Sequence, residues 1–296
     1  MTVPTAPPAE EEEKKPEKGW PPTETKLGII AAVLGIIMTI LPFLPACVKA
    51  IGLSFVLVWG ADAVRKTSRY GLGTGVPSIG VLAVGYGVIG AIAGMGIANV
   101  GGDFTAKIGG VDVEVLNVGV LGGIAIAALI GGISGIFSNS EKFISMKIPG
   151  LERGMTELGV AGTLAFLLES SMVAGTLKLN AVLEDVFFSG AIAFMFIMSA
   201  IGMFHPFNAC LGPDEDRGRT LLVSFEISGL ICIILGIVSI ALGAEWLGSQ
   251  SLGLANAVGL ILYGIVVWVV FYAKFVRRSF EASYEVVGTG LIKTVK

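Results

Sequence analysis

Apolar segments of about 20 residues recur along this chain, and their recurrence limits what it can fold into. A stretch of this length is what an α-helix needs to cross the hydrocarbon core of a bilayer. Unpartnered strands facing lipid are excluded, because their backbone polar groups would stay unpaired inside the membrane. The expected spans are 27–44, 46–64, 80–100, 116–137, 158–177, 186–204, 221–243 and 252–271. The sequence therefore predicts an all-α polytopic membrane protein with about eight transmembrane helices.

The composition excludes an ordinary soluble domain. Of the 296 residues, 54% are hydrophobic and only 15% are charged, whereas soluble domains carry about 25% charged residues. The 42 glycines fit the membrane class, because close helix packing in lipid favours small residues. Glycines spaced four residues apart, which we expect to bring helices close together, are Gly90 and Gly94, Gly119 and Gly123, and Gly131 and Gly135.

Lysine and arginine lie almost entirely on one side of the predicted membrane. Loops on the cytoplasmic side of membrane proteins carry the excess of these residues. With the N-terminus placed inside, 17 of the 20 basic residues are inside, and only Lys49, Lys107 and Lys178 are outside. Lys49 is expected to extend its amine toward the interface, as long basic side chains do. The sequence thus predicts a multi-pass protein of the cell membrane with both termini in the cytoplasm.

The polar segments define the expected domain organisation. Residues 1–26 are rich in proline and acidic residues and predict a disordered cytoplasmic tail. Residues 27–273 form the transmembrane domain, and 274–296 form a cytoplasmic C-terminal tail. The outer loop 101–115 is glycine-rich and alternating, which predicts a small hairpin. The eight spans also divide into four plus four, which allows a parallel repeat.

The stretch YGLGTGVPSIG, residues 70–80, is rich in glycine, as phosphate-binding loops are. A Walker A loop needs a lysine directly after its last glycine, but Val81 and Leu82 follow Gly80. In this stretch Gly71, Gly73 and Gly75 give G-x-G-x-G rather than the dinucleotide-binding pattern G-x-G-x-x-G, and no strand of a dinucleotide-binding fold precedes them. Two interpretations remain. One is a tight turn built by glycine and Pro77, and the other is a loop that contacts a neighbouring protein in a complex.

Carboxylate side chains inside the expected spans are candidates for ion transport. Ionisable residues are rare within the membrane and usually face the protein interior. Glu169 lies near the middle of its span and is followed by Ser170, and carboxylate and hydroxyl oxygens suit hard cations such as Na⁺. Asp62 and Glu226 lie toward the inner ends of their spans. The candidate Na⁺ path therefore comprises Glu169, Ser170, Asp62 and Glu226.

The same carboxylates also have a structural interpretation, which the sequence leaves open. Asp62 is close enough along the chain to pair with Arg65 or Lys66. Glu169 and Glu226 would, on this interpretation, make buried hydrogen bonds between helices or contact a partner protein.

The sequence offers no catalytic set. His205 is its only histidine, so a Ser–His–Asp or Cys–His arrangement would depend on that residue alone. One histidine with Cys210 supplies too few ligands for a zinc site. The acidic run 214–216 beside Arg217 is interpreted as a cap for the following helix, or as a loop that docks a partner.

Two stretches resemble one known family. WGADAVRKTSRYGLGTGVPSIG, residues 59–80, resembles a region of the C subunit of the sodium-translocating tetrahydromethanopterin S-methyltransferase of methanogenic archaea. HPFNACLGPDEDRGRT, residues 205–220, is similar to a later loop of the same family, and the order of the spans agrees. The acidic tail 1–26 departs from the resemblance, so it is assigned no role.

The resemblance implies a complex that transfers a methyl group from methyl-tetrahydromethanopterin to coenzyme M and drives Na⁺ outward. It implies that the A subunit, a partner, carries a corrinoid and that the H subunit performs the first methyl transfer. This chain would hold no cofactor and no catalytic residue, and it would keep the membrane sector together. Its partners would be the A, B, D, E, F, G and H subunits and archaeal membrane lipids, but not nucleic acid. The expected subunit-contact residues are Tyr70, Gly71, Gly73, Gly75, Pro77, Asn208, Asp214 and Asp216.

Two other functions remain open on the sequence. A stand-alone secondary transporter would also be polytopic, would use intramembrane carboxylates and would suit a four-plus-four repeat. A purely structural membrane scaffold would need only the close helix packing that the glycines predict.

Overall fold

The computed structural model describes residues 22–68, 75–175, 177–183, 190–209, 217–241 and 252–288. Within these ranges the chain forms eight helices of 19 residues or more. They are α1 (Pro22–Ile40), α2 (Ala46–Ser68), α3 (Gly75–Ile97), α4 (Gly119–Asn139), α5 (Leu151–Ala174), α7 (Ala191–Ala209), α8 (Arg217–Ala241) and α9 (Leu252–Gly288). A short helix, α6 (Leu179–Val182), precedes α7, and a π-helical turn, η1 (Ala98–Gly102), follows α3.

The predicted all-α polytopic membrane fold is confirmed. In the described residues, six helices are long and apolar enough to cross a membrane: α2, α3, α4, α5, α8 and α9. Two more, α1 and α7, contain shorter apolar stretches, Lys26–Ile40 and Ala193–Pro206. The number of eight spans and the four-plus-four repeat stay predictions.

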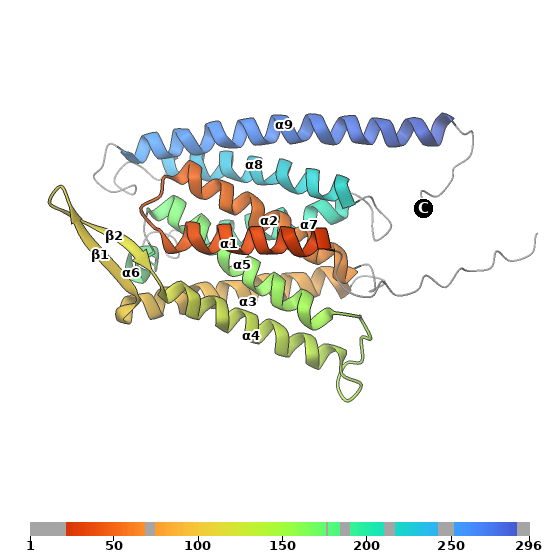
Figure 1. Ribbon diagram of the computed structural model, residues 1–296, viewed down its shortest axis with the longest axis horizontal. Helices are drawn as coiled ribbons and strands as arrows, with labels where there is room; N and C mark the ends of the chain where they lie inside the picture. The colour runs from red at the N-terminus through yellow and green to blue at the C-terminus, as the bar shows by residue number, and fades with distance from the viewer. Residues whose placement is uncertain are drawn as a thin grey trace, which may run out of the picture.

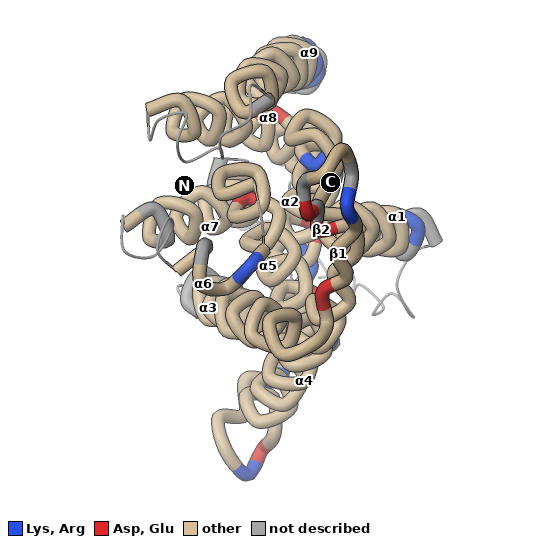
Figure 2. The backbone as a smooth tube through the Cα atoms, turned by 90° about the vertical axis from the view of Figure 1, so that its left-hand side faces the viewer, with Lys and Arg blue, Asp and Glu red and all other residues tan. Residues whose placement is uncertain are grey.

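The long helices lie side by side along the longest axis of the molecule (Figure 1). The start of α1, the end of α9 and the connection between α4 and α5 lie at one end of this axis (Figure 1). Viewed from the opposite end, α5 is central, whereas α1, α4 and α9 lie at the rim (Figure 2). Burial agrees, because 89% of the most apolar stretch of α5 is buried but only 17% of that of α9. The core of the fold therefore surrounds α5.

Glycines set the close approach of α3, α4 and α5. A Cβ added to Gly90 of α3 would lie 2.7 Å from the carbonyl oxygen of Gly123 of α4. A Cβ added to Gly131 of α4 would lie 2.5 Å from the carbonyl oxygen of Met155 of α5. No larger side chain fits at these contacts without moving a backbone. The predicted close packing of the glycine-striped helices is confirmed.

A two-stranded antiparallel hairpin confirms the expectation for the outer loop. Strand β1 (Asp103–Ile108) pairs with β2 (Val111–Asn117), with Ile108 opposite Val111. Gly109 and Gly110 connect the strands with φ of 61° and 85°, which glycine adopts at no steric cost. The hairpin extends from the end of the molecule opposite the α4–α5 connection (Figure 1).

The glycine-rich loop after α2 is shorter than the expected range 65–79. Helix α2 continues to Ser68, and α3 already begins at Gly75. Gly75 and Pro77 are therefore in the first turn of α3, where a proline costs no intrahelical hydrogen bond. The candidate contact residues Tyr70, Gly71 and Gly73 lie outside the described residues.

The later loop 205–220 is likewise partly helical. Helix α7 continues through Pro206 to Ala209, so Asn208 belongs to its last turn. Helix α8 begins at Arg217, and the candidate contact residues Asp214 and Asp216 lie outside the described residues.

Other helix ends also differ from the expected ranges. Helix α1 begins at Pro22, so residues 22–26 are helical rather than disordered; residues 1–21 lie outside the described part of the chain. Helix α5 begins at Leu151, seven residues before the expected span. Its first turns contain charged residues, which a search for apolar stretches excludes. Helix α9 continues to Gly288, well into the expected C-terminal tail.

Candidate functional site

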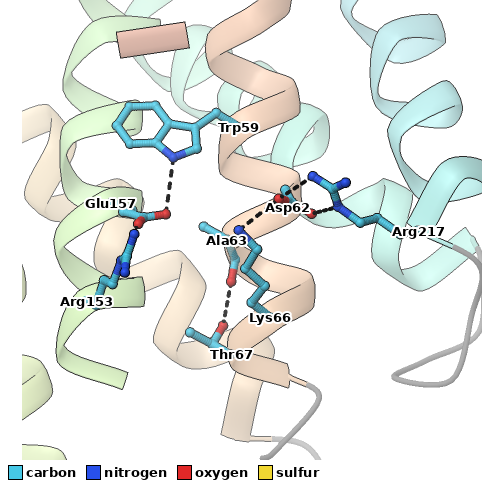
Figure 3. Close-up of polar contacts among 8 residues, drawn as sticks. All are labelled: Trp59, Asp62, Ala63, Lys66, Thr67, Arg153, Glu157 and Arg217. Carbon is cyan, nitrogen blue, oxygen red and sulfur yellow. Dashed lines mark hydrogen bonds and ion pairs between the residues drawn. The ribbon is translucent and has the colours of Figure 1, made fainter. Parts of the chain in front are cut away.

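The two stretches that resemble a family meet at an ion pair between α2 and α8 (Figure 3). Arg217 donates from Nε to Oδ1 of Asp62 at 2.9 Å and from Nη2 to Oδ2 at 3.1 Å. Lys66 Nζ lies 3.0 Å from Oδ2 of the same carboxylate. Asp62 is only 1% exposed, so its charge is neutralised where water cannot reach it. Paired bonds of this kind fix orientation as well as distance.

A second carboxylate lies nearby, on α5. Glu157 accepts a hydrogen bond from Trp59 Nε1 of α2 at 3.1 Å and another from Arg153 Nε at 3.0 Å (Figure 3). Trp59 is 7% exposed and lies against Gly28 of α1, where an added Cβ would be 3.2 Å from Nε1. We refer to these residues together as the ion cluster. Its members are Trp59, Asp62, Lys66, Arg153, Glu157 and Arg217.

The ion cluster is partly what the sequence predicts. The pairing of Asp62 with Lys66 is confirmed. The sequence predicts that Arg217 lies near the start of its helix. It does not predict the hydrogen bond from Arg217 to Asp62, because the two residues are 155 positions apart. The cluster thus joins the first resembling stretch to the end of the second. Its hydrogen bonds and ion pairs connect α2 to α5 and to α8 at one end of the bundle.

A different polar centre lies deep between α5 and α7. Glu169 has no exposed surface, and its Oε2 accepts a hydrogen bond from Ser199 Oγ at 3.0 Å. Its Oε1 is buried and has no hydrogen-bond partner among the described residues. Ser170, which follows it, donates to the sulfur of Met195 at 3.6 Å. The expected buried hydrogen bond between helices is present at Glu169, and a role in ion transport stays a prediction.

The remaining intramembrane charges have separate surroundings. Glu226 is half-buried on α8 and accepts a hydrogen bond from Trp268 of α9. Lys49 is 2% exposed, and the charge of Glu114 on β2 acts on it. The expectation that Lys49 extends to the interface is therefore wrong. The strand that supplies Glu114 lies 65 residues further along the chain, so no local pattern predicts this partner.

The four residues of the predicted Na⁺ path do not form one site in the described residues. Asp62 belongs to the ion cluster, Glu226 lies against α9, and Glu169 with Ser170 lies in the core. In the same described part of the chain, no three His, Cys, Asp or Glu side chains come close enough to hold a metal ion. His205 is exposed.

Comparison with known proteins identifies the family. Residues 6–295 match the family model of the C subunit of tetrahydromethanopterin S-methyltransferase. The match begins at residue 6, so most of the acidic N-terminal segment lies within the family, contrary to the expectation that it departs from it.

Relatives with this name cover nearly the whole chain. The C subunit of Methanosarcina mazei is 38% identical over 284 residues, which are 94% of this chain and 95% of the relative. That of Methanothermobacter thermautotrophicus is 35% identical over 90% of both chains. That of Methanopyrus kandleri is 34% identical over 97% of this chain and 94% of the relative. The chain therefore belongs to the family of tetrahydromethanopterin S-methyltransferase C subunits.

Proposed function

We propose that this chain is a non-catalytic membrane subunit of the methyltransferase complex. In this proposal the complex moves a methyl group from methyl-tetrahydromethanopterin to coenzyme M and couples that transfer to outward Na⁺ translocation. Membership of the family along nearly the entire chain carries the proposal. The reacting groups, including a corrinoid, would be held by other subunits.

A structural role for this chain agrees with its charged groups. The acids of the ion cluster are bonded to basic side chains or to tryptophan, which leaves them occupied in holding helices together. Catalytic acids and bases need a proton that they can give or take at a reacting atom. The two carboxylates of the cluster, Asp62 and Glu157, instead connect helices.

The ion cluster supports a role in contacts between subunits. It fixes the start of α8 against α2 near the end of that helix. We assign partner contacts to this end, and we propose that it is cytoplasmic because the excess of basic residues supports that orientation. The partners are the A, B, D, E, F, G and H subunits, and the exposed apolar sides of α4 and α9 face archaeal lipid or membrane subunits.

Isolation in mild detergent tests the proposal. The chain is expected to co-purify with corrinoid-carrying methyltransferase subunits and with methyl transfer to coenzyme M that depends on Na⁺. Recovery of the chain as a free, stable monomer that transports solute by itself would instead support the stand-alone transporter. Reconstitution in vesicles then measures the Na⁺ ions moved for each methyl group transferred.

A further inference from the structure

The carboxyl group of Glu169 is the least satisfied buried acid in the described part of the chain. Its side chain is fully buried, and one carboxyl oxygen, Oε1, has no hydrogen-bond partner there. No described lysine, arginine or histidine forms an ion pair with it. Other acids in the bundle differ, since the buried Asp62 and the half-buried Glu157 each bond a basic side chain.

Neither protonation state satisfies this carboxyl group by itself. If Glu169 is ionised, it is a buried charge without a counterion, which costs several kcal/mol. If Glu169 is neutral, an Oε2–H can donate to Ser199 Oγ, but Oε1 still has no hydrogen-bond partner among the described residues, and an unmade buried hydrogen bond also costs free energy. A cation held at Oε1 removes both penalties, because it neutralises the charge and occupies the free oxygen.

The surroundings of Glu169 are polar on the side of α7 and α8. Ser199 Oγ of α7 already lies 3.0 Å from Oε2. Cys232 of α8 is fully buried and lies within electrostatic range of Glu169. The carboxylate of Glu169 and the hydroxyl of Ser199 supply the oxygen atoms that hard cations prefer, whereas the thiol of Cys232 is too soft to be a ligand for Na⁺.

A chain of hydroxyl groups lies next to this centre. Ser228 of α8 donates to Ser54 of α2 at 2.9 Å, and Ser54 shares a hydrogen bond of 2.9 Å with Tyr263 of α9. Tyr263 in turn lies within electrostatic range of Cys232. Hydrogen-bonded polar side chains from α2, α5, α7, α8 and α9 are therefore present inside the bundle, in two groups.

We infer that Glu169 and Ser199 bind the monovalent cation that the complex translocates, with Oε1 of Glu169 as the principal ligand. The inference rests on the proposed function, and it selects one of the four predicted ion-path residues. Asp62 is excluded because three basic-group contacts already occupy its two oxygens. Glu226 is half-buried and bonded to Trp268. Ser170 is directed to the sulfur of Met195.

The position of Glu169 fits the outer part of an ion path. Because α5 begins at Leu151 and ends at Ala174, Glu169 lies five residues from the end of the helix, about 8 Å along its axis, and not near the middle as the sequence predicts. This end is on the side of the hairpin, which the distribution of basic residues places outside. A cation held at Glu169 would therefore have crossed most of the bundle before its release.

The test uses the complete complex in proteoliposomes, with methyl transfer and Na⁺ transport measured in the same preparation. Glu169→Gln is expected to raise the Na⁺ concentration for half-maximal methyl transfer by at least about tenfold, since it removes a charge-assisted ligand. Ser199→Ala is expected to raise it by about threefold to tenfold, the equivalent of one hydrogen bond. Both variants should lower the number of Na⁺ ions bound by the detergent-solubilised complex.

Matched controls separate ion binding from packing. Glu152→Gln changes a half-buried acid on the same helix, and Ser239→Ala removes a buried hydroxyl that bonds only within α8. Both should keep the Na⁺ dependence of the parent complex. Glu169→Asp, which keeps the carboxylate but shortens the side chain, replaces Glu169→Gln if that variant does not assemble, and a shifted Na⁺ dependence is again expected.

The outcomes are distinguishable. An assembled Glu169→Gln complex with the parent Na⁺ dependence and the parent Na⁺-to-methyl ratio overturns the inference. A parent complex whose methyl transfer neither needs nor moves Na⁺ overturns the proposed function itself, whatever the variants show.

Discussion

Arg217 donates two hydrogen bonds to Asp62, and together they join the first turn of α8 to α2 across 155 residues of sequence. Asp62 is almost fully buried, while Arg217 keeps a quarter of its side chain exposed. The ion pair therefore stabilises the charged form of the buried aspartate, whereas the arginine can still be hydrated by water.

Single and double substitutions test this pair. Arg217→Ala leaves Asp62 with Lys66 as its remaining basic partner, and Asp62→Ala leaves Arg217 able to turn to solvent. Each should destabilise the chain, and the double variant should be less destabilised than the sum, by an interaction energy of about 1–3 kcal/mol. Thermal unfolding of the four purified complexes in detergent measures it. Lys142→Ala, in an exposed loop, is the control; additive effects would contradict a direct pair.

Lysine in place of Arg217 tests the geometry of the same contact. Lys keeps the charge but loses the planar pair of donors, so Arg217→Lys should retain only part of the stability of the parent. Unfolding temperatures of Arg217→Lys, Arg217→Ala and the parent are compared. Equal values for Lys and Arg would show that charge alone matters.

The buried Lys49 predicts a connection between α2 and the hairpin. Removing its charge with Lys49→Met should leave Glu114 without that partner and loosen the hairpin. Amide hydrogen exchange over 103–117 should then become faster. Lys107→Met removes an exposed lysine of β1 and should leave exchange unchanged near α2. Parent-like exchange in Lys49→Met would show that Glu114 does not depend on Lys49.

The glycine contacts predict a sharp contrast within α3. Gly90→Ala places a methyl group within 2.7 Å of the backbone of α4, whereas Gly85→Ala meets nothing within 4 Å. Gly90→Ala should cost about 1–3 kcal/mol through overpacking. Gly85→Ala should be neutral or slightly stabilising, because alanine favours helix. Thermal unfolding of both variants provides the comparison, and similar losses would disprove close α3–α4 packing.

Cysteine labelling tests the predicted orientation. Lys142→Cys lies in the exposed connection between α4 and α5, and Lys107→Cys lies on the exposed strand β1 at the other end of the bundle. A membrane-impermeant thiol reagent should label Lys142→Cys only from the cytoplasmic side and Lys107→Cys only from outside, above the background of the native cysteines. The reverse pattern would invert the topology.

The sequence predicts features that depend on local pattern. Apolar length gives the membrane class, the Gly109–Gly110 turn gives the hairpin, and the four-residue glycine spacing gives the close helix contacts. It misses contacts between distant segments. The sequence does not predict that α5 begins at Leu151, because Arg153 and Glu157 interrupt the apolar pattern there. In the structure these two residues form an ion pair with each other within the helix.

In the candidate site, too, local features can be predicted from the sequence and contacts between distant segments cannot. Glu169 can be selected from sequence as an acid in an apolar segment, but its partner Ser199 comes from another helix and has no local signal. Lys49 shows the opposite error, because the general behaviour of long basic side chains predicts exposure, whereas Lys49 is buried near the half-buried Glu114 of the hairpin.

The length of α9 has a mechanical consequence. The guanidinium of Arg278 lies against Gly218 in the first turn of α8, and α9 continues for ten more residues to Gly288. A helix of that length adds about 15 Å beyond this contact. The last ten residues of α9 therefore continue as a helix past its contact with the start of α8. The angle at which α9 packs on α8 thus also determines the position of Gly288.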